Sequence, residues 1–189
     1  WVRDAGFTVY MPHLFGEDGA PPGGVGGALT MIGGCISRRF KAFAANESSP
    51  EVEWLRALAS QAHRQCGGRG VGAIGMCFTG NFALSMMLDP SVVAPVLSQP
   101  SLPLGNPAGM HIAQHELETI KTRMKEEDLT VLAYRFKGDR FCRKERFDAY
   151  EAALGDRFVR RELEDSAANP DAPMKNPHCV VTLHLIDEE

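Results

Sequence analysis

Several features that would place the protein in a broad class are missing from its 189 residues. No apolar run approaches the roughly 20 residues that a membrane-spanning helix needs, and the first residues do not have the pattern of a signal peptide. Basic residues form no stripe with interleaved aromatic residues, and the net charge is −4. We therefore expect neither nucleic acid nor a membrane among the partners.

Cysteine pairs with metal-binding or redox spacing are also missing. The chain has five cysteines, an odd number, and they are widely spaced without a C-x-x-C pair: Cys35, Cys66, Cys77, Cys142 and Cys179. This pattern argues against a secreted disulfide framework and against a zinc ribbon. It favours a reducing compartment, and we expect a cytoplasmic protein.

The apolar residues, 44% of the chain, alternate between strand-length and helix-length segments. The predicted strands cover 6–11, 70–75, 92–98, 129–136 and 157–163, and the predicted helices cover 50–66, 81–88, 110–128 and 143–154. This order predicts a single α/β domain over 1–189, a doubly wound and mostly parallel sheet with helices on both faces. In such sheets ligands bind beyond the carboxyl ends of the strands.

The opening of the chain has an unusual order of elements. It begins at Trp1 with what reads as the tail of a helix, which runs directly into the strand predicted over 6–11. Because a fold rarely starts in this way, we expect the chain to be a fragment of a longer one. Residues 16–34, which are rich in glycine and proline, are predicted to form a long surface loop.

A short glycine-flanked segment, GMCFTG over 75–80, lies between a predicted strand and a predicted helix. This arrangement is typical of a nucleophile elbow, usually G-x-S-x-G, in which a tight turn presents the nucleophile above the sheet. Here Cys77 takes the place of serine, and Thr79 replaces the last glycine. The backbone N–H of Phe78 would be one oxyanion donor. The alternative is that Cys77 is simply a small buried residue.

An elbow of this kind requires an acid and then a histidine, each after a later strand. Asp139 follows the strand predicted over 129–136, and His178 follows the strand predicted over 157–163. In this interpretation His178 takes the thiol proton and Asp139 orients its imidazole. Asp139 could instead be an ordinary turn aspartate.

The chain has other histidines besides His178. His13 follows the first predicted strand at the same rim, where it could contact a substrate. His184 sits inside an apolar run and reads as a packed residue. His111 and His115 lie four apart on a predicted helix, but the zincin pattern needs glutamate where Ile112 stands, so we expect an exposed helix face, no metal and no cofactor.

Together, four segments resemble the dienelactone hydrolase family, which are α/β-hydrolases with a Cys-Asp-His triad. The segments are GFTVYMPHLFG, GAIGMCFTGNFAL, FKGD and PHCVVTLHL, and the likeness runs from Gly6 to about Asp187. The resemblance implies a hydrolase of small esters or lactones that works through a thioester on Cys77. It also implies an arginine for a substrate carboxylate, Arg38 or Arg39. The strands that open the family's fold have no counterpart in this chain.

Two rival functions follow from the same residues. A glutamine amidotransferase also places cysteine on an elbow, but its histidine is normally followed closely by glutamate, whereas Cys179 and Val180 follow His178. A non-catalytic binding or scaffolding relative could keep the fold without the chemistry. Selective alkylation of Cys77 over the other cysteines would favour an activated nucleophile over the scaffold.

Overall fold

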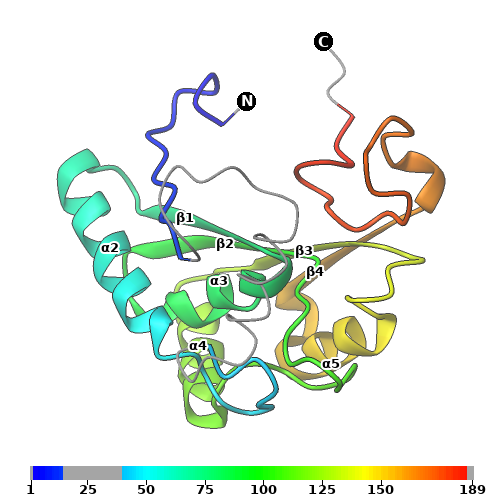
Figure 1. Ribbon diagram of the computed structural model, residues 1–189. Helices are drawn as coiled ribbons and strands as arrows, with labels where there is room; N and C mark the ends of the chain where they lie inside the picture. The colour runs from blue at the N-terminus through cyan, green and yellow to red at the C-terminus, as the bar shows by residue number, and fades with distance from the viewer. Residues whose placement is uncertain (1, 15–39, 187–189) are drawn as a thin grey trace.

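The computed structural model describes residues 2–14 and 40–186 (Figure 1). The loop predicted over 16–34, together with Arg38 and Arg39, lies outside the described residues.

A four-stranded sheet forms the centre of the described fold. Its strands are β1 (Val71–Met76), β2 (Val92–Ser98), β3 (Val131–Phe136) and β4 (Phe158–Leu163). They lie in sequence order, and every neighbouring pair is parallel. The prediction of a parallel α/β sheet is thus confirmed, with four of the five predicted strands found within two residues of their expected starts.

The helices cover one face of this sheet. They are α2 (Glu51–Cys66), α3 (Phe82–Ser85), α4 (Gln114–Glu126) and α5 (Lys144–Leu154). Short 3-10 turns occur at Cys77–Thr79, Met86–Leu88, Gly155–Arg157 and Asp165–Ala167. Figure 1 shows α3, α4 and α5 on the same side of the sheet, and α2 packs beside α3 and the turn that follows it.

Helices on both faces, as expected for a doubly wound sheet, are not found in the described part of the chain. The physical reason is the strand order. Each connection from β1 to β4 moves one position in the same direction, and right-handed crossovers that all move in one direction pass over the same face. The prediction of helices on both faces is therefore wrong for the described residues.

Burial along β1 follows from this one-sided arrangement. Ala73 is buried under the helices, whereas Ile74 and Met76 point to the opposite face and are exposed. The main core lies between the sheet and the helices and includes Leu84 and Phe147. Fully burying one such side chain contributes about 1.5–3 kcal/mol, so this layer holds the strand ends in place.

The predicted strand over 6–11 does not form. Phe7 is 66% exposed and Met11 is 88% exposed, and the segment has no strand geometry. A β-strand requires a hydrogen-bonded neighbour, and no described strand pairs with this segment. Tyr10 instead donates a hydrogen bond to Gln65 Oε1 (2.7 Å) at the end of α2.

The segment after β4 crosses the face of the sheet that the helices leave open. Val180 and Ala168 pack on Phe136 of β3 and form a second, smaller cluster there. Figure 1 places this segment on the side of the sheet opposite α5. None of the helices in the described ranges is both long enough and apolar enough to cross a membrane.

Candidate active site

The segment GMCFTG forms a sharp turn directly after β1. Cys77 has φ of 51°, in the left-handed region that a residue with a side chain rarely adopts. A Cβ on Gly75 would come within 2.3 Å of the Thr79 carbonyl oxygen, and a Cβ on Gly80 within 2.5 Å of Pro100 Cα. Glycine is required at both positions because the backbone approaches so closely. The geometry is that of a nucleophile elbow.

Thr79 fits this turn despite replacing a glycine. Its Oγ1 donates to the Met76 carbonyl oxygen (3.0 Å) and accepts from the Met76 N–H (3.2 Å). The hydroxyl therefore closes the turn across Cys77 and gives the N–H and the carbonyl oxygen of Met76 a side-chain partner.

Asp139 lies in the turn after β3, where it is 4% exposed. Its Oδ1 accepts from the N–H of Phe141 (2.8 Å) and of Cys142 (3.1 Å). Its Oδ2 lies 2.7 Å from Nδ1 of His178. One carboxylate oxygen is thus fixed by its own loop, which leaves the other aimed at the imidazole.

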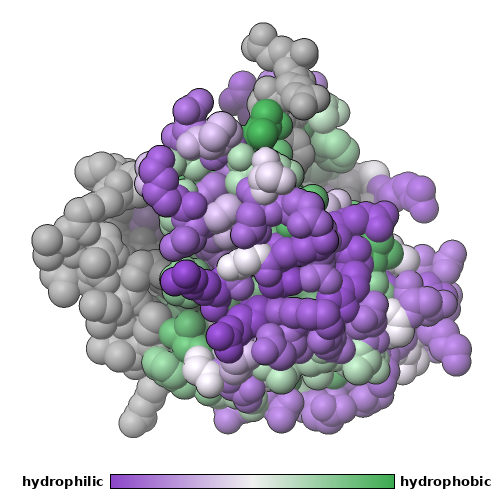
Figure 2. Space-filling model, turned by 90° about the vertical axis from the view of Figure 1, so that its right-hand side faces the viewer, coloured by the Kyte–Doolittle hydropathy of each residue, from purple (hydrophilic) through white to green (hydrophobic). Residues whose placement is uncertain are grey.

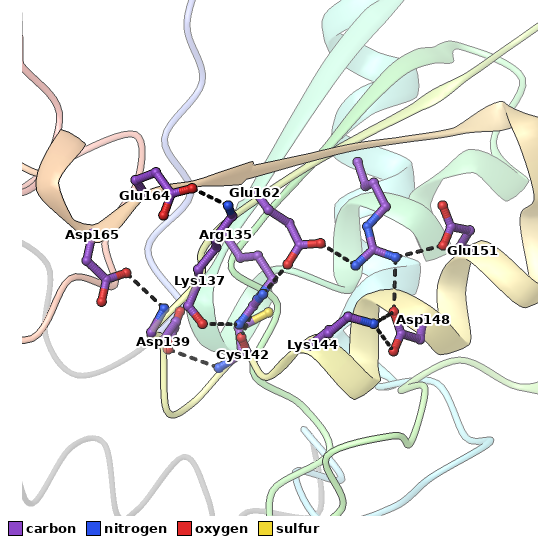
Figure 3. A network of polar contacts seen from close by, with 12 residues as sticks. Arg135, Lys137, Asp139, Cys142, Lys144, Asp148, Glu151, Glu162, Glu164 and Asp165 are labelled. Atoms are coloured by element: carbon purple, nitrogen blue, oxygen red, sulfur yellow. Dashed lines mark hydrogen bonds and ion pairs between the residues drawn. The ribbon is translucent and has the colours of Figure 1, made fainter.

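Two further side chains brace the loop that carries Asp139 (Figure 3). The buried guanidinium of Arg135 donates to the carbonyl oxygens of Cys142 (2.8 Å) and Lys137 (2.9 Å), and it pairs with Glu162. From the other side, Asp165 Oδ1 accepts from the Gly138 N–H (2.8 Å). The loop 137–142, which carries Asp139, is therefore held to β3 and to the 3-10 turn that follows β4.

His178 is buried, and its two ring nitrogens differ in their surroundings. Nδ1 is held by Asp139, whereas Nε2 makes no hydrogen bond of good geometry with a described residue. The Phe141 ring contacts the imidazole edge to face at 5.2 Å. Burial by itself would lower the pKa of His178, but the hydrogen bond with Asp139 and the interaction with Cys77 outweigh it and raise this pKa to about 9.

The thiol of Cys77 lies close enough to that imidazole for each group to shift the pKa of the other. Burial raises the pKa of Cys77, but interactions with His178, with the Ser101 hydroxyl and with the Phe78 N–H lower it further than burial raises it. The net effect is a pKa below the ordinary cysteine value. The two shifts favour a thiolate at Cys77 and an imidazolium at His178, and the Phe78 N–H interacts with the Cys77 sulfur.

Two polar side chains of the site were not identified from the sequence, Gln99 and Ser101. The Ser101 N–H donates to the Cys77 carbonyl oxygen (2.9 Å), and its hydroxyl donates to the Gln99 carbonyl oxygen (3.0 Å). Gln99 Oε1 accepts from the Val180 N–H (3.3 Å). Their position directly after β2, at the carboxyl edge of the sheet, was the signal that could have found them.

The remaining predicted histidines have other roles. His13 is exposed, and within the described residues no hydrogen bond or ion pair joins it to Cys77, Asp139 or His178. The interpretation of His111 as part of an exposed helix face is wrong: it precedes α4, is 1% exposed and bonds the Lys41 carbonyl oxygen (3.0 Å). His115 is exposed on α4. No group of three potential metal ligands occurs in the part of the chain that is described.

The other cysteines near the site are not activated. Cys142 is fully buried and its pKa is raised, chiefly by that burial. Cys179 is half-buried, and burial followed by the proximity of Cys77 raises its pKa as well. Since the thiolate is the reactive form, Cys77 is the cysteine of this group that is set up to react.

A small cavity of about 160 Å³ adjoins the imidazole. It is lined by Asp139, Arg140, Phe141, Asn176, Pro177 and His178. Arg140 and Phe141 directly follow Asp139 in the loop after β3, and both are exposed. The imidazole of His178 therefore has the guanidinium of Arg140 and the ring of Phe141 beside it.

The raised pKa of His178 gives a direct prediction. In Asp139→Asn the carboxylate is lost, so the pKa of His178 should fall from about 9 toward the ordinary histidine value of about 6.5. A pH titration of the imidazole signals by NMR measures this shift. Asp148→Asn is the matched control, since Asp148 pairs with Lys144 and Arg160 on the surface, and an equal shift in that variant would contradict the assignment.

No protein-family model matches the chain, and neither a curated protein nor a solved structure matches it.

Proposed function

We propose that the protein is a cysteine-dependent hydrolase of small esters or lactones. The observation that carries the proposal is the pairing of Cys77, on a positive-φ turn after β1, with an imidazole that Asp139 holds at 2.7 Å. A nucleophile, a base and a group that orients the base are the minimum set for acyl transfer.

The proposed reaction has two steps. The Cys77 thiolate adds to the ester carbonyl carbon, and the Phe78 N–H stabilises the resulting oxyanion. The carbon–oxygen bond of the ester then breaks, His178 Nε2 gives its proton to the leaving alcohol, and a thioester remains on Cys77. In the second step His178 takes a proton from water, and hydroxide adds to the carbonyl carbon of the thioester. The carbon–sulfur bond then breaks, which releases the acid and restores the Cys77 thiolate beside the protonated His178.

We also propose that the chain has an α/β-hydrolase fold and belongs to the dienelactone hydrolase family. Nucleophile, acid and histidine follow β1, β3 and β4 in that order, which is the chain order of the α/β-hydrolases. A cytosolic setting is part of the proposal, because the described cysteines are free thiols.

We further propose that the substrate carries a carboxylate. Among the described residues, Arg140 is the candidate to bind it, because Arg140 lines the cavity beside His178. Arg140→Gln should raise KM about tenfold for an ester that also has a free carboxylate, since the substitution removes a charge-assisted hydrogen bond to that carboxylate. KM for a neutral ester of the same size should change little. Arg143→Gln is the control, because Arg143 is exposed on the next turn but does not line the cavity. Equal effects on both esters would contradict a carboxylate site.

The function is tested with p-nitrophenyl acetate and with a small lactone. We expect turnover of both, and in rapidly acid-quenched samples we expect mass spectrometry to find an acetyl group on the peptide that contains Cys77. Turnover without the adduct would argue against covalent catalysis. If turnover is absent and iodoacetamide labels all cysteines alike, the scaffolding alternative is favoured instead.

A further inference from the structure

Three consecutive backbone N–H groups at the catalytic histidine are held by side chains rather than by secondary structure. The N–H groups of His178 (3.3 Å) and Cys179 (3.1 Å) both donate to Nδ1 of His184. The N–H of Val180 donates to Gln99 Oε1 (3.3 Å). The histidine segment belongs to no helix or strand, so these acceptors take the place of a regular backbone partner.

The hydrogen bonds of the His184 imidazole fix its tautomer. Because Nδ1 accepts two N–H groups it carries no proton, so the ring proton must be on Nε2, which donates to the Met174 carbonyl oxygen (2.8 Å). His184 is 2% exposed, and its ring lies 5.8 Å from the Phe136 ring of β3. This second imidazole thus connects the sheet, the preceding loop and the histidine segment.

The backbone of His184 closes the same loop. Its N–H donates to the Cys179 carbonyl oxygen (3.1 Å), and its carbonyl oxygen accepts from the Asn169 N–H (3.1 Å). His184 therefore folds residues 178–184 into a closed turn by its main chain and by its side chain. An apolar residue of similar size would fill the space but would leave two buried N–H groups without an acceptor.

We propose that His184 is the positioning residue of His178, a neutral imidazole that fixes the backbone of the catalytic histidine so that its ring reaches both Asp139 and Cys77. The inference rests on the proposed function, in which His178 is the base. It goes beyond that function by assigning a role to a residue whose position in an apolar run indicates packing alone.

The test uses three substitutions in the full chain. His184→Leu removes both polar contacts, His184→Asn keeps an acceptor near the place of Nδ1, and His184→Gln keeps a donor near the place of Nε2. The main readout is the pH midpoint of Cys77 alkylation by iodoacetamide, followed peptide by peptide. This midpoint reports how well His178 stabilises the thiolate, and it needs no substrate.

We expect the midpoint to rise by about one pH unit in His184→Leu, because His178 no longer sits against the thiol. In the same variant kcat/KM should fall about 100-fold through kcat, as expected when a reacting group is displaced by about 1 Å. His184→Asn should keep the wild-type midpoint, whereas His184→Gln should shift it. If His184→Leu does not fold, the comparison of the asparagine and glutamine variants decides the question.

His111→Leu is the matched control. His111 is equally buried, also bonds a carbonyl oxygen through Nε2, and also lies against a phenylalanine ring, Phe82. The His111→Leu variant should have a lower melting temperature and an unchanged pH midpoint of Cys77 alkylation. The proposal is overturned if His111→Leu shifts the midpoint as much, or if the asparagine and glutamine variants of His184 behave alike. Failure of the proposed function is seen separately, as absence of esterase turnover in the wild-type protein.

Discussion

Cys77→Ala should reduce kcat/KM for activated esters by at least about 10⁴-fold, since removal of the nucleophile of a triad leaves only binding and oxyanion stabilisation. Alanine at position 77 must adopt the same φ of 51°, so the turn is kept while the sulfur is lost. Cys77→Ser should also retain little activity, because serine has a much higher pKa than the thiol and needs a stronger base. Both variants are compared with the wild type by steady-state kinetics.

Cys66→Ala is the control for this experiment. Cys66 is an exposed free thiol at the end of α2, before the start of β1, whereas the elbow follows the other end of that strand. Its loss should leave kcat/KM within a factor of two of the wild type. Circular dichroism of each variant checks that the fold is kept. Residual turnover by Cys77→Ala at more than a few per cent would show that another group carries the reaction.

Arg146→Met should lower the free energy of unfolding by about 3 kcal/mol, because buried carbonyl oxygens would lose their donor at about 1–3 kcal/mol each. Arg146 comes from α5, is 1% exposed and donates to four carbonyl oxygens of one loop, those of Leu102, Pro103, Asn106 and Gly109. Asn81 also donates to the Leu102 carbonyl oxygen (2.7 Å), which offsets part of the loss. Urea denaturation measures the change.

The control for Arg146 is Arg157→Met. Arg157 pairs with Asp128, a side chain that is almost fully exposed, and such pairs contribute about 1 kcal/mol or less. Arg146→Lys should destabilise nearly as much as the methionine variant, since one ammonium group cannot replace a fork that reaches four acceptors. A loss below about 1 kcal/mol in Arg146→Met would show that water replaces the guanidinium.

Strands and long helices could be predicted because their signals are local. The apolar run over 92–98 is bounded by a proline on either side, at Pro90 and Pro100, and it forms β2 at the same bounds. The run over 6–11 has the same local character but no described strand beside it, so it stays exposed. Strand pairing depends on the neighbour, and a single segment carries no information about that neighbour.

The acid and the histidine could be predicted because each follows a strand, and the carboxyl ends of parallel strands share one edge of the sheet. The structure brings Asp139 and His178 together as expected. Ser101, Gln99 and His184 were missed because their roles depend on contacts between distant segments. His184 shows the difficulty best, since an apolar run hides a polar ring that finds its acceptor and donor partners only in the folded chain.

Charged side chains of α5 and β4 form a network of ion pairs on the surface. Figure 2 shows a mainly hydrophilic face on this side of the molecule. There Asp148 pairs with Lys144 (2.8 Å) and with Arg160 (3.0 Å), which also reaches Glu151 (2.7 Å). The link from Asp148 on α5 to Arg160 on β4 joins two elements that only the folded sheet brings together.

The φ of 51° at Cys77 implies a conflict between stability and activity at a single position. A left-handed conformation costs a residue with a side chain about 1–2 kcal/mol, and glycine avoids this cost. The backbone therefore favours glycine at position 77, whereas the proposed reaction requires a thiol. A descendant that no longer needed the reaction would gain stability from Cys77→Gly, so this position should be among the first to record loss of the activity during evolution.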